Sequence, residues 1–520
     1  MWAAPLLLDV LGRVLVAQLG TGTPAPAPVV PPSVPPVTAP TPAADGLAAW
    51  AGEPRVTTLP EVLQSTVQHS PALASAKLDI AIAEARIEQT YSRDDWHLQA
   101  QLSAGRTTGF ISGLAIARQT SIAATGDIYR GFSTGGTLNF HVASRYTSSD
   151  SSGTGPVGLG SGTSWYDEIS ATYTQPLLRN RGRFLYEANA RRATIANEVS
   201  TLARRNVAIR QIQTVVSAYW DLVLAERQVA IAEASLDLAR ERLRVTQIGV
   251  DGGKTPRSEL PAVQQIIATR EEEVLTTELA VIERSLTLRR AAGMPIGVGE
   301  VGLRVAEDLG IDPHAWELGP LIERAYTASP ELAQLDKQDA AATIDVEVAA
   351  NGLLTRLDAA LTIGPTGQQN NALDAATSVV KLEAMTYLGT LTLQHDFGNQ
   401  QAHGIYREQQ VTQRKLAVTA LDVRAQLAQT MAQAVAQLEL ARRRVTLSER
   451  AIELANQNIK LESDRFSLGK STNFDVLNRQ EDLRQANLRQ AQAMIDWHKA
   501  ESTVQALTGD LLPTYGITLE

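Results

Sequence analysis

The sequence predicts a mostly α-helical fold with a smaller β part, built from one structural unit that occurs twice. Three observations support this prediction. The chain matches itself at a constant shift of 216 residues, as between Gly253 and Gly469 or between Gly293 and Gly509. It contains two long stretches with helical periodicity. It also contains short segments in which polar and apolar residues alternate, which is typical of β-strands with one polar face.

Composition narrows the function classes. The 520-residue chain has 5% aromatic residues, a net charge of -9 and no cysteine. Low aromatic content favours helix pairs packed at short distance over one thick globular core. The negative charge gives no support to nucleic-acid binding. The absence of cysteine excludes disulfides, thiol chemistry and a lipid-modified N-terminal cysteine.

The N-terminal part is interpreted as a signal segment followed by a linker. Residues 1–22 are apolar but irregular as a signal, because Asp9 and Arg13 interrupt them and no positive region precedes them. A mis-set start or a cytosolic tail is the alternative. Residues 23–58 are rich in proline and therefore predict an extended linker. No later segment has 18 consecutive apolar residues, so no transmembrane helix is predicted there.

Two Gly-Lys stretches resemble the end of a nucleotide-binding P-loop, "GGKT" at Gly252 and "GKST" at Gly469. The P-loop needs another glycine five residues before the last one, and Ile248 and Asp464 stand at those positions. Helical sequence also precedes both stretches, where a P-loop follows a strand. We therefore interpret them as the turns of two antiparallel helical hairpins, at 184–293 and 401–509.

Each half has the same order of elements. A helix pair broken at Ser-Pro comes first, at Ser70 and again at Ser329, then a β-rich segment, then a long hairpin. The first repeat is predicted to span 59–300, with strands within 97–177. The second spans 301–512, with helices at 318–350 and strands within 355–396, and residues 513–520 form a tail.

The alternating segments predict two strands in each half. "HLQAQLSAG" from His97 is typical, with apolar residues on one face and polar residues on the other. A membrane β-barrel assembled from several chains would require such strands, and two half-exposed soluble hairpins are the alternative. "TGGTLNFHVASRYTSSD" from Thr134 reads as a further strand. With the loop from Ser148 to Ser164 it is interpreted as an enlarged extracellular excursion.

From about Leu59 to Leu512 the chain resembles the TolC-type outer membrane factors, the outer membrane efflux protein family. The resemblance rests on the duplicated layout, the Ser-Pro breaks, "QPLLRNRG" from Gln175, "AYWDLVLA" from Ala218 and the hairpin tip "FSLGKSTNFDVL" from Phe466. It implies a homotrimer in which four strands per subunit close a 12-stranded barrel in the outer membrane of a Gram-negative bacterium. The long helices would form a second, α-helical barrel in the periplasm.

The resemblance also implies a function without catalysis or cofactors. Members of the family are passive exit ducts of tripartite efflux pumps or type I secretion systems. Their partners are a periplasmic adaptor (membrane fusion) protein and an inner-membrane RND pump or ABC transporter. The seven histidines here show no metal-ligand spacing. A soluble periplasmic coiled-coil adaptor or scaffold is the alternative function.

The family's pore constriction and gate can be carried over to five positions. Asp475 matches the first acidic position of the constriction, Asn478 occupies the second, and Glu259 matches a gate acid. Two positions depart from the family pattern, because Phe466 replaces an aromatic hydroxyl and Ser471 replaces an arginine. We therefore expect a single ring of carboxylates and a closed state that depends more on packing than on charge pairs.

The turns of the two hairpins are the expected docking points for the adaptor. They contain Gly253 and Lys254 in the first hairpin, and Gly469 and Lys470 in the second. The glycines are explained equally well by the turn itself, since a tight turn after a helix often requires a left-handed residue.

Overall fold

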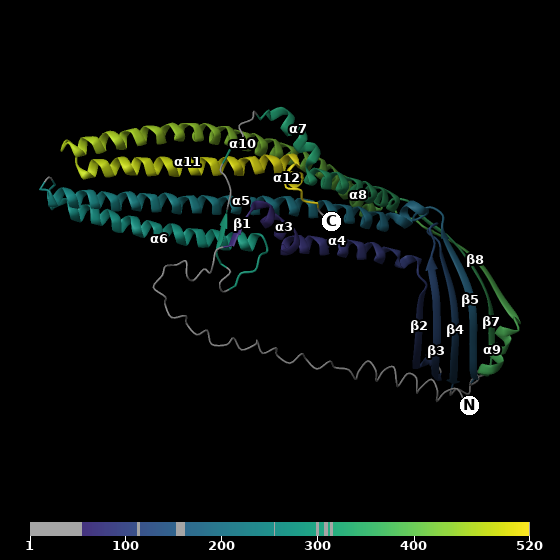
Figure 1. The fold of residues 1–520 in the computed structure, drawn as a ribbon. Helices are drawn as coiled ribbons and strands as arrows, with labels where there is room; N and C mark the ends of the chain where they lie inside the picture. Colours follow the sequence, from purple (N-terminus) through teal and green to yellow (C-terminus); the bar gives the residue numbers. More distant parts are fainter. Residues whose placement is uncertain are drawn as a thin grey trace, which may run out of the picture. The chain divides into compact units, whose positions relative to one another are not determined.

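The computed structural model describes residues 55–111, 115–151, 162–253, 255–297, 301–305, 310–311 and 316–518. The signal segment predicted at 1–22 and residues 23–54 of the predicted linker lie outside the described residues. The part that is described is mostly helical and contains one antiparallel sheet, which confirms the predicted fold class at this level (Figure 1).

Four long helices form two antiparallel hairpins (Figure 1). Their bounds are α5 (Arg183–Asp251), α6 (Glu259–Ala291), α10 (Gln400–Ser467) and α11 (Asn473–Thr508). The 69 residues of α5 correspond to about 100 Å at 1.5 Å per residue. α5 packs along α6, and α10 packs along α11. α11 also packs against α5, so the two hairpins contact each other within one chain.

Shorter helices precede each hairpin and flank its first helix. They are α3 (Leu59–His69) and α4 (Pro71–Thr90) in the first half, and α7 (Leu318–Ala328) and α8 (Pro330–Gly352) in the second. The chain is extended at Ser70 and Ser329, and the following proline occupies the first turn of the next helix, where no amide hydrogen is required. α4 packs on α5, and α8 packs on both α5 and α10.

Small residues at the helix seams allow the long helices to approach closely. Ala225, Ala232 and Ala239 of α5 are buried, as are Ala441 and Ala455 of α10. The largest buried side chains gather where the short helices join the hairpins. One cluster surrounds Tyr219, Trp220 and Ile495, and a second surrounds Met431 and Trp497. The packing that orients the hairpins is therefore concentrated far from their tips.

Six strands form one antiparallel sheet in the order β2-β3-β4-β5-β7-β8 (Figure 1). Their bounds are β2 (His97–Ile111), β3 (Ala115–Gly131), β4 (Thr137–Ser151), β5 (Gly162–Pro176), β7 (Arg356–Gln369) and β8 (Ala384–Gln394). Helix α9 (Ala372–Val380) joins the last two strands and packs on β7. A separate parallel pair joins β1 (Arg55–Thr57) to β6 (Leu303–Val305). Two short elements complete the order, η1 (Tyr91–Asp94) and α12 (Leu511–Thr514).

The predicted number of strands is wrong for the first half. Two were expected there, and the sheet has four, so the expectation of four strands per chain is corrected to six. The further strand predicted from Thr134 is confirmed as β4, which pairs with both neighbours over nearly its whole length. β3 escaped prediction because its apolar face is diluted by Thr120, Ala124 and Gly126, which weakens the period of two.

Among the described residues, no helix has both the length and the apolar character needed to cross a membrane.

Candidate functional site at the hairpin tips

Both hairpin turns use a left-handed glycine to end the first helix. Gly253 has φ +69° and Gly469 has φ +72°. In the second turn Gly469 N donates to Phe466 O at 2.9 Å and Lys470 N donates to Arg465 O at 2.9 Å. These are the two hydrogen bonds of a Schellman cap. In the first turn Gly253 N donates to Val250 O at 3.0 Å. Lys254 lies outside the described residues.

Asp475 forms the cap of α11. Its Oδ2 accepts bonds from Thr472 N at 3.1 Å and Thr472 Oγ1 at 2.7 Å, and the Thr472 hydroxyl accepts from Asp475 N in return. These bonds from Thr472 are the largest cause that lowers the pKa of Asp475 below its usual range. The carboxylate is therefore ionised at neutral pH, while one of its oxygens stabilises the start of the helix.

Glu259 stands at the equivalent position of the first hairpin but reaches across to the second. Its Oε2 accepts a hydrogen bond from the side-chain amide of Asn473 in α11. Asn473 is only 4% exposed, and its Oδ1 accepts from the hydroxyl of buried Thr246 in α5 at 3.3 Å. Three helices, α5, α6 and α11, thus meet at one amide side chain.

Arg242 and Phe466 form a second contact between the hairpins. The Arg242 guanidinium of α5 lies 3.9 Å from the centre of the Phe466 ring of α10. Arg242 is buried, and within the described residues its Nε and Nη2 atoms have no hydrogen-bond partner. Burial lowers the pKa of Arg242, and the nearby Glu259 carboxylate opposes this shift. A cation on an aromatic face here takes the place of the hydroxyl contact implied by the resemblance.

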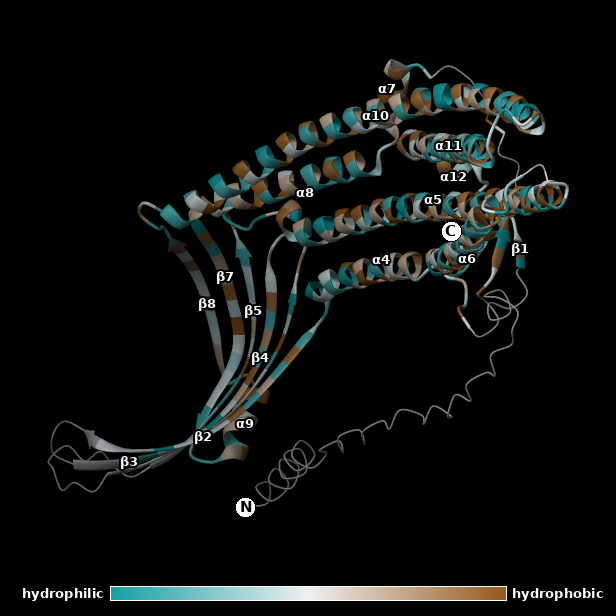
Figure 2. Cartoon of the chain, turned by 90° about the vertical axis from the view of Figure 1, so that its left-hand side faces the viewer, coloured by the Kyte–Doolittle hydropathy of each residue, from teal (hydrophilic) through white to brown (hydrophobic). Residues whose placement is uncertain are grey.

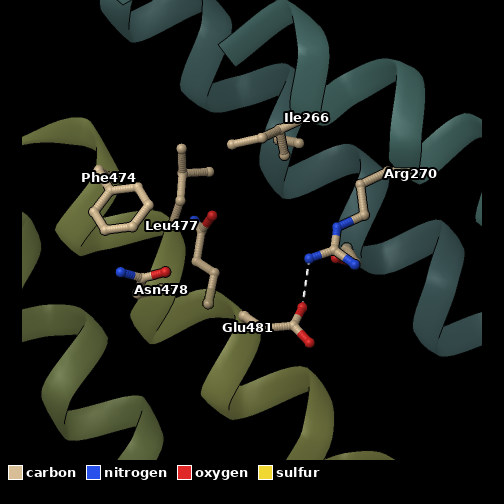
Figure 3. A pocket seen from close by; sticks show the side chains of 9 residues that line it. Ile266, Arg270, Phe474, Leu477, Asn478 and Glu481 are labelled. Atoms are coloured by element: carbon tan, nitrogen blue, oxygen red, sulfur yellow. Dashed lines mark hydrogen bonds and ion pairs between the residues drawn. The ribbon is translucent and has the colours of Figure 1, made fainter. Parts of the chain in front are cut away.

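Ser471 and Asn478 have different surroundings. Ser471 Oγ donates to Glu462 of α10 and lies 3.3 Å from Asp475 Oδ2, so Ser471 ties the turn to both helices of its own hairpin. Asn478 lines a pocket of about 160 Å³ between α5, α6 and α11, beside Phe474 and Leu477 (Figure 3). The pocket wall on α6 is Ile266 and Arg270, and Glu481 lies at its edge.

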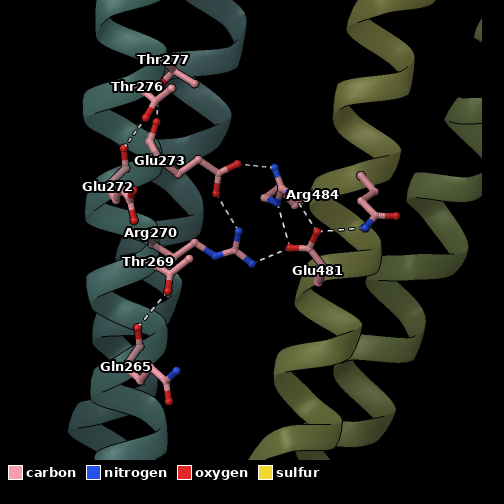
Figure 4. A network of polar contacts seen from close by, with 10 residues as sticks. Gln265, Thr269, Arg270, Glu272, Glu273, Thr276, Thr277, Glu481 and Arg484 are labelled. Carbon is pink, nitrogen blue, oxygen red and sulfur yellow. Dashed lines mark hydrogen bonds and ion pairs between the residues drawn. The ribbon is translucent and has the colours of Figure 1, made fainter.

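Four charged residues link α6 to α11 next to the pocket, and we call them the ion cluster (Figure 4). Arg270 Nη2 lies 2.5 Å from Glu481 Oε2, and Arg484 Nη1 lies 2.6 Å from Glu273 Oε1. Within each helix the pairs Arg270–Glu273 and Arg484–Glu481 complete the ring at 2.7 and 2.6 Å. The side chains are 16–28% exposed. The bonds from Arg484 are the largest cause that lowers the pKa of Glu481 to about 2.

The structure connects two of the five predicted gate residues, Glu259 and Phe466, through residues that the sequence analysis did not identify. Glu259 and Phe466 are connected through Asn473, Thr246 and Arg242, and Ser471 is attached to Asp475 rather than to Glu259. A signal for Arg242 existed, because it lies three residues after Ala239, as Ala239 lies three after Leu236, and is a single charge on this apolar face of α5.

Among the described residues, no group of three or more histidine, cysteine, aspartate or glutamate side chains could hold a metal ion.

Comparisons with known proteins identify the fold. No protein-family model and no curated protein matches the sequence. Solved structures match over most of the chain. The outer-membrane channel OprN has 14% identity and a TM-score of 0.65, with 87% of this chain and 90% of that chain covered. VceC from Vibrio cholerae has 13% identity and a TM-score of 0.62, with 89% and 97% covered.

A third match is the open state of the MtrE outer membrane channel of Neisseria gonorrhoeae, at 14% identity and a TM-score of 0.62, with 91% of this chain and 94% of that chain covered. Identities of this size establish a shared fold, and the coverage extends over both the hairpins and the sheet. The chain therefore has the fold of the outer membrane factor channels, as the resemblance in its sequence predicts.

Proposed function

We propose that the chain is the outer membrane channel of a tripartite efflux pump or a type I secretion system in a Gram-negative bacterium. It would act as a homotrimer and a passive exit duct, with its sheet in the outer membrane and its hairpins in the periplasm. The hairpin turns would dock on a periplasmic adaptor protein, and an RND pump or an ABC transporter in the inner membrane would supply the cargo.

The observation that carries this proposal is that the sheet has one apolar and one polar face, and Figure 2 colours the residues of its strands by hydropathy. Cross-strand pairs and the alternation of strands place Leu98, Ile169, Leu361 and Leu391 on one face, and all four are exposed. The opposite face carries polar residues such as Thr172, whose hydroxyl lies 2.9 Å from that of a threonine on β7. A soluble scaffold would gain nothing from an exposed apolar sheet face, whereas lipid would cover it.

A leucine stripe on α10 supports assembly from several copies. Four leucines of α10 and the residue that follows the helix recur every seven residues and are 51–70% exposed, namely Leu440, Leu447, Leu454, Leu461 and Leu468. A repeat of seven is typical of a helix that packs lengthwise on another helix. At the repeat-equivalent positions of α5, Leu224 and Ile231 are half-buried, whereas Leu238 and Val245 nearer the tip are 43% and 37% exposed, and α5 packs on α11 of the same chain.

A comparison of α11 with its repeat equivalent α6 indicates which helix would cover the leucine stripe. Ala491 and Ile495 of α11 are buried within the chain, whereas their repeat equivalents on α6, Leu275 and Leu279, are 52% and 44% exposed. Since α11 packs on α5, the duplication favours the equivalent packing of α6 on α10. That packing would be made by α6 of the next copy, and repeated around three copies it closes a ring of hairpins.

Membrane fractionation followed by planar-bilayer recording tests the proposal. The protein should remain with the outer membrane, require detergent for extraction, and produce stepwise conductance after reconstitution. A protein that appears in buffer without detergent and gives no conductance would contradict the channel and favour the scaffold.

A further inference from the structure

The sheet has two more strands than the resemblance implies, and they form one hairpin inserted between β2 and β5. Cross-strand pairs place Ile111 beside Ala115, and Ser149 beside Gly162. β2 therefore ends and β5 begins at the same end of the sheet. The β3–β4 hairpin starts at that end and returns to it, so the strands alternate in direction across all six positions.

The inserted strands have the same two faces as their neighbours. Ile122 and Ile128 of β3 and Phe140 and Val142 of β4 are all exposed. Ile128 pairs directly with Leu98 of β2 and with Phe140, which extends the apolar face across the inserted hairpin without interruption.

The opposite face of the hairpin is polar and internally bonded. Asn139 Nδ2 donates to Asp127 Oδ1 at 3.0 Å, and His141 Nδ1 lies 2.8 Å from the same oxygen. A hairpin that extended from the barrel into water would expose its continuous apolar face to solvent, which is unfavourable. A hairpin in the wall of a membrane barrel needs one apolar and one polar face.

Both outer strands of the sheet have an unpaired edge. β2 is exposed along nearly all its described side chains, and β8 is exposed along its whole length. β8 contains no charged residue and no proline, the features that soluble proteins use to protect a free edge. Because four strands of alternating direction lie between them, β2 and β8 run in opposite directions and can pair antiparallel between copies.

We propose that β2 of one copy pairs with β8 of the next, and that three copies close a barrel of eighteen strands. The partner at each edge is a second copy of this chain. The trimer in this inference rests on the proposed function, whereas the presence of all six strands in the barrel wall rests on the sheet itself. Barrel diameter grows roughly in proportion to strand number, so the barrel would be about half again as wide as one of twelve strands.

A strand count in a cryo-electron-microscopy map of the detergent-solubilised trimer tests the barrel directly. Eighteen strands with β2 beside β8 of the next copy are expected. A trimer with twelve strands in its wall and the β3–β4 hairpin outside would overturn the inference and leave the proposed channel intact. A particle that is not a trimer would overturn both the eighteen-strand barrel and the proposed assembly.

A second measurement tests the position of β4 without counting strands. The chain has no cysteine, so single cysteines can be introduced and labelled with a fluorophore in reconstituted protein. Val142→Cys should be quenched by brominated lipid, and its neighbour Ala143→Cys by a water-soluble quencher. The matched controls on β7 are Leu361→Cys, facing lipid, and Thr362→Cys, facing water.

The controls separate the two proposals. If lipid quenches the label at Leu361 and not the label at Val142, the inserted hairpin lies outside the membrane and the eighteen-strand barrel is wrong. If lipid quenches neither label, the sheet does not face lipid and the proposed function is contradicted as well.

Discussion

Replacing Glu481 by Gln should weaken the contact between the two hairpins of one chain. Glu481 accepts bonds from Arg484 Nε at 2.8 Å and Nη2 at 2.6 Å, and from Arg270 Nη2 at 2.5 Å. Glutamine keeps the shape of the side chain and removes its charge. The two arginines would retain only Glu273 as a shared partner, so the link between α6 and α11 would lose one of its two carboxylates.

The size of the effect can be worked from the pKa of Glu481, which is lowered from 4.5 to about 2. At about 1.4 kcal/mol per unit of pKa this corresponds to roughly 3 kcal/mol. Solvent screens this carboxylate, and the largest cause of the shift, Arg484, lies on the same helix, so we expect about 0.5–1 kcal/mol to act between the hairpins. If opening separates α6 from α11, the open-to-closed ratio should rise about 2- to 5-fold for each chain altered.

Single-channel recording of the reconstituted protein measures this ratio. The matched control is Glu439→Gln on α10. Glu439 also binds two arginines, but both belong to its own helix, so its loss leaves the contact between hairpins unchanged. An open-to-closed ratio that does not change in Glu481→Gln, or that changes equally in Glu439→Gln, would refute a role for the ion cluster in holding the hairpins together.

Three further predictions concern single side chains. Glu259→Gln removes the charge from the bond with Asn473 and should raise channel opening; unchanged opening at both low and high ionic strength would show that this bond does not hold the closed state. Asp475→Asn keeps an oxygen that can cap α11 and should weaken block by a trivalent cation added from the periplasmic side, with the trimer retained; undiminished block would place Asp475 outside the constriction. Burial lowers the pKa of His498, which stacks on Trp220 at 3.9 Å, to about 4. Above the unfolded pKa near 6.5, His498 is neutral in both the folded and the unfolded state and costs no stability. As pH falls from 6.5 toward 4, the unfolded state gains a proton that the folded state does not, and on the order of 3 kcal/mol of stability is lost. His498→Phe should therefore flatten the fall of Tm between these values, and an unaltered slope would assign the acid sensitivity to other groups.

The helical hairpins could be predicted because their signal is local. A seam of residues spaced by three and four runs along each helix, and the left-handed glycines Gly253 and Gly469 mark where it turns. The strand number could not be predicted with the same success, since β3 has a weak period and belongs to the sheet through its pairing with β2 and β4. Pairing of this kind depends on neighbours that a single segment does not reveal.

In the candidate site, too, local features can be predicted from the sequence and contacts between distant segments cannot. The cap at Asp475 is readable from Thr472-x-x-Asp475, a capping-box pattern at a helix start. The contact of Arg242 with Phe466 is not, because it joins two hairpins whose relative rotation is set by distant packing around Tyr219 and Ile495. The family resemblance suggested Glu259 as a gate acid, which stays a prediction, whereas the bond of Glu259 to Asn473 follows only from the structure.

The number of chains in the detergent-solubilised particle tests the channel account most directly. Open edges on β2 and β8 leave backbone groups unpaired in lipid, at a cost of several kcal/mol each, so a single chain cannot form the membrane part alone. Native mass spectrometry combined with circular dichroism should show a trimer of the 55.9 kDa chain and no stable smaller species with full β content. A monomer that keeps all its β structure in detergent would contradict the account.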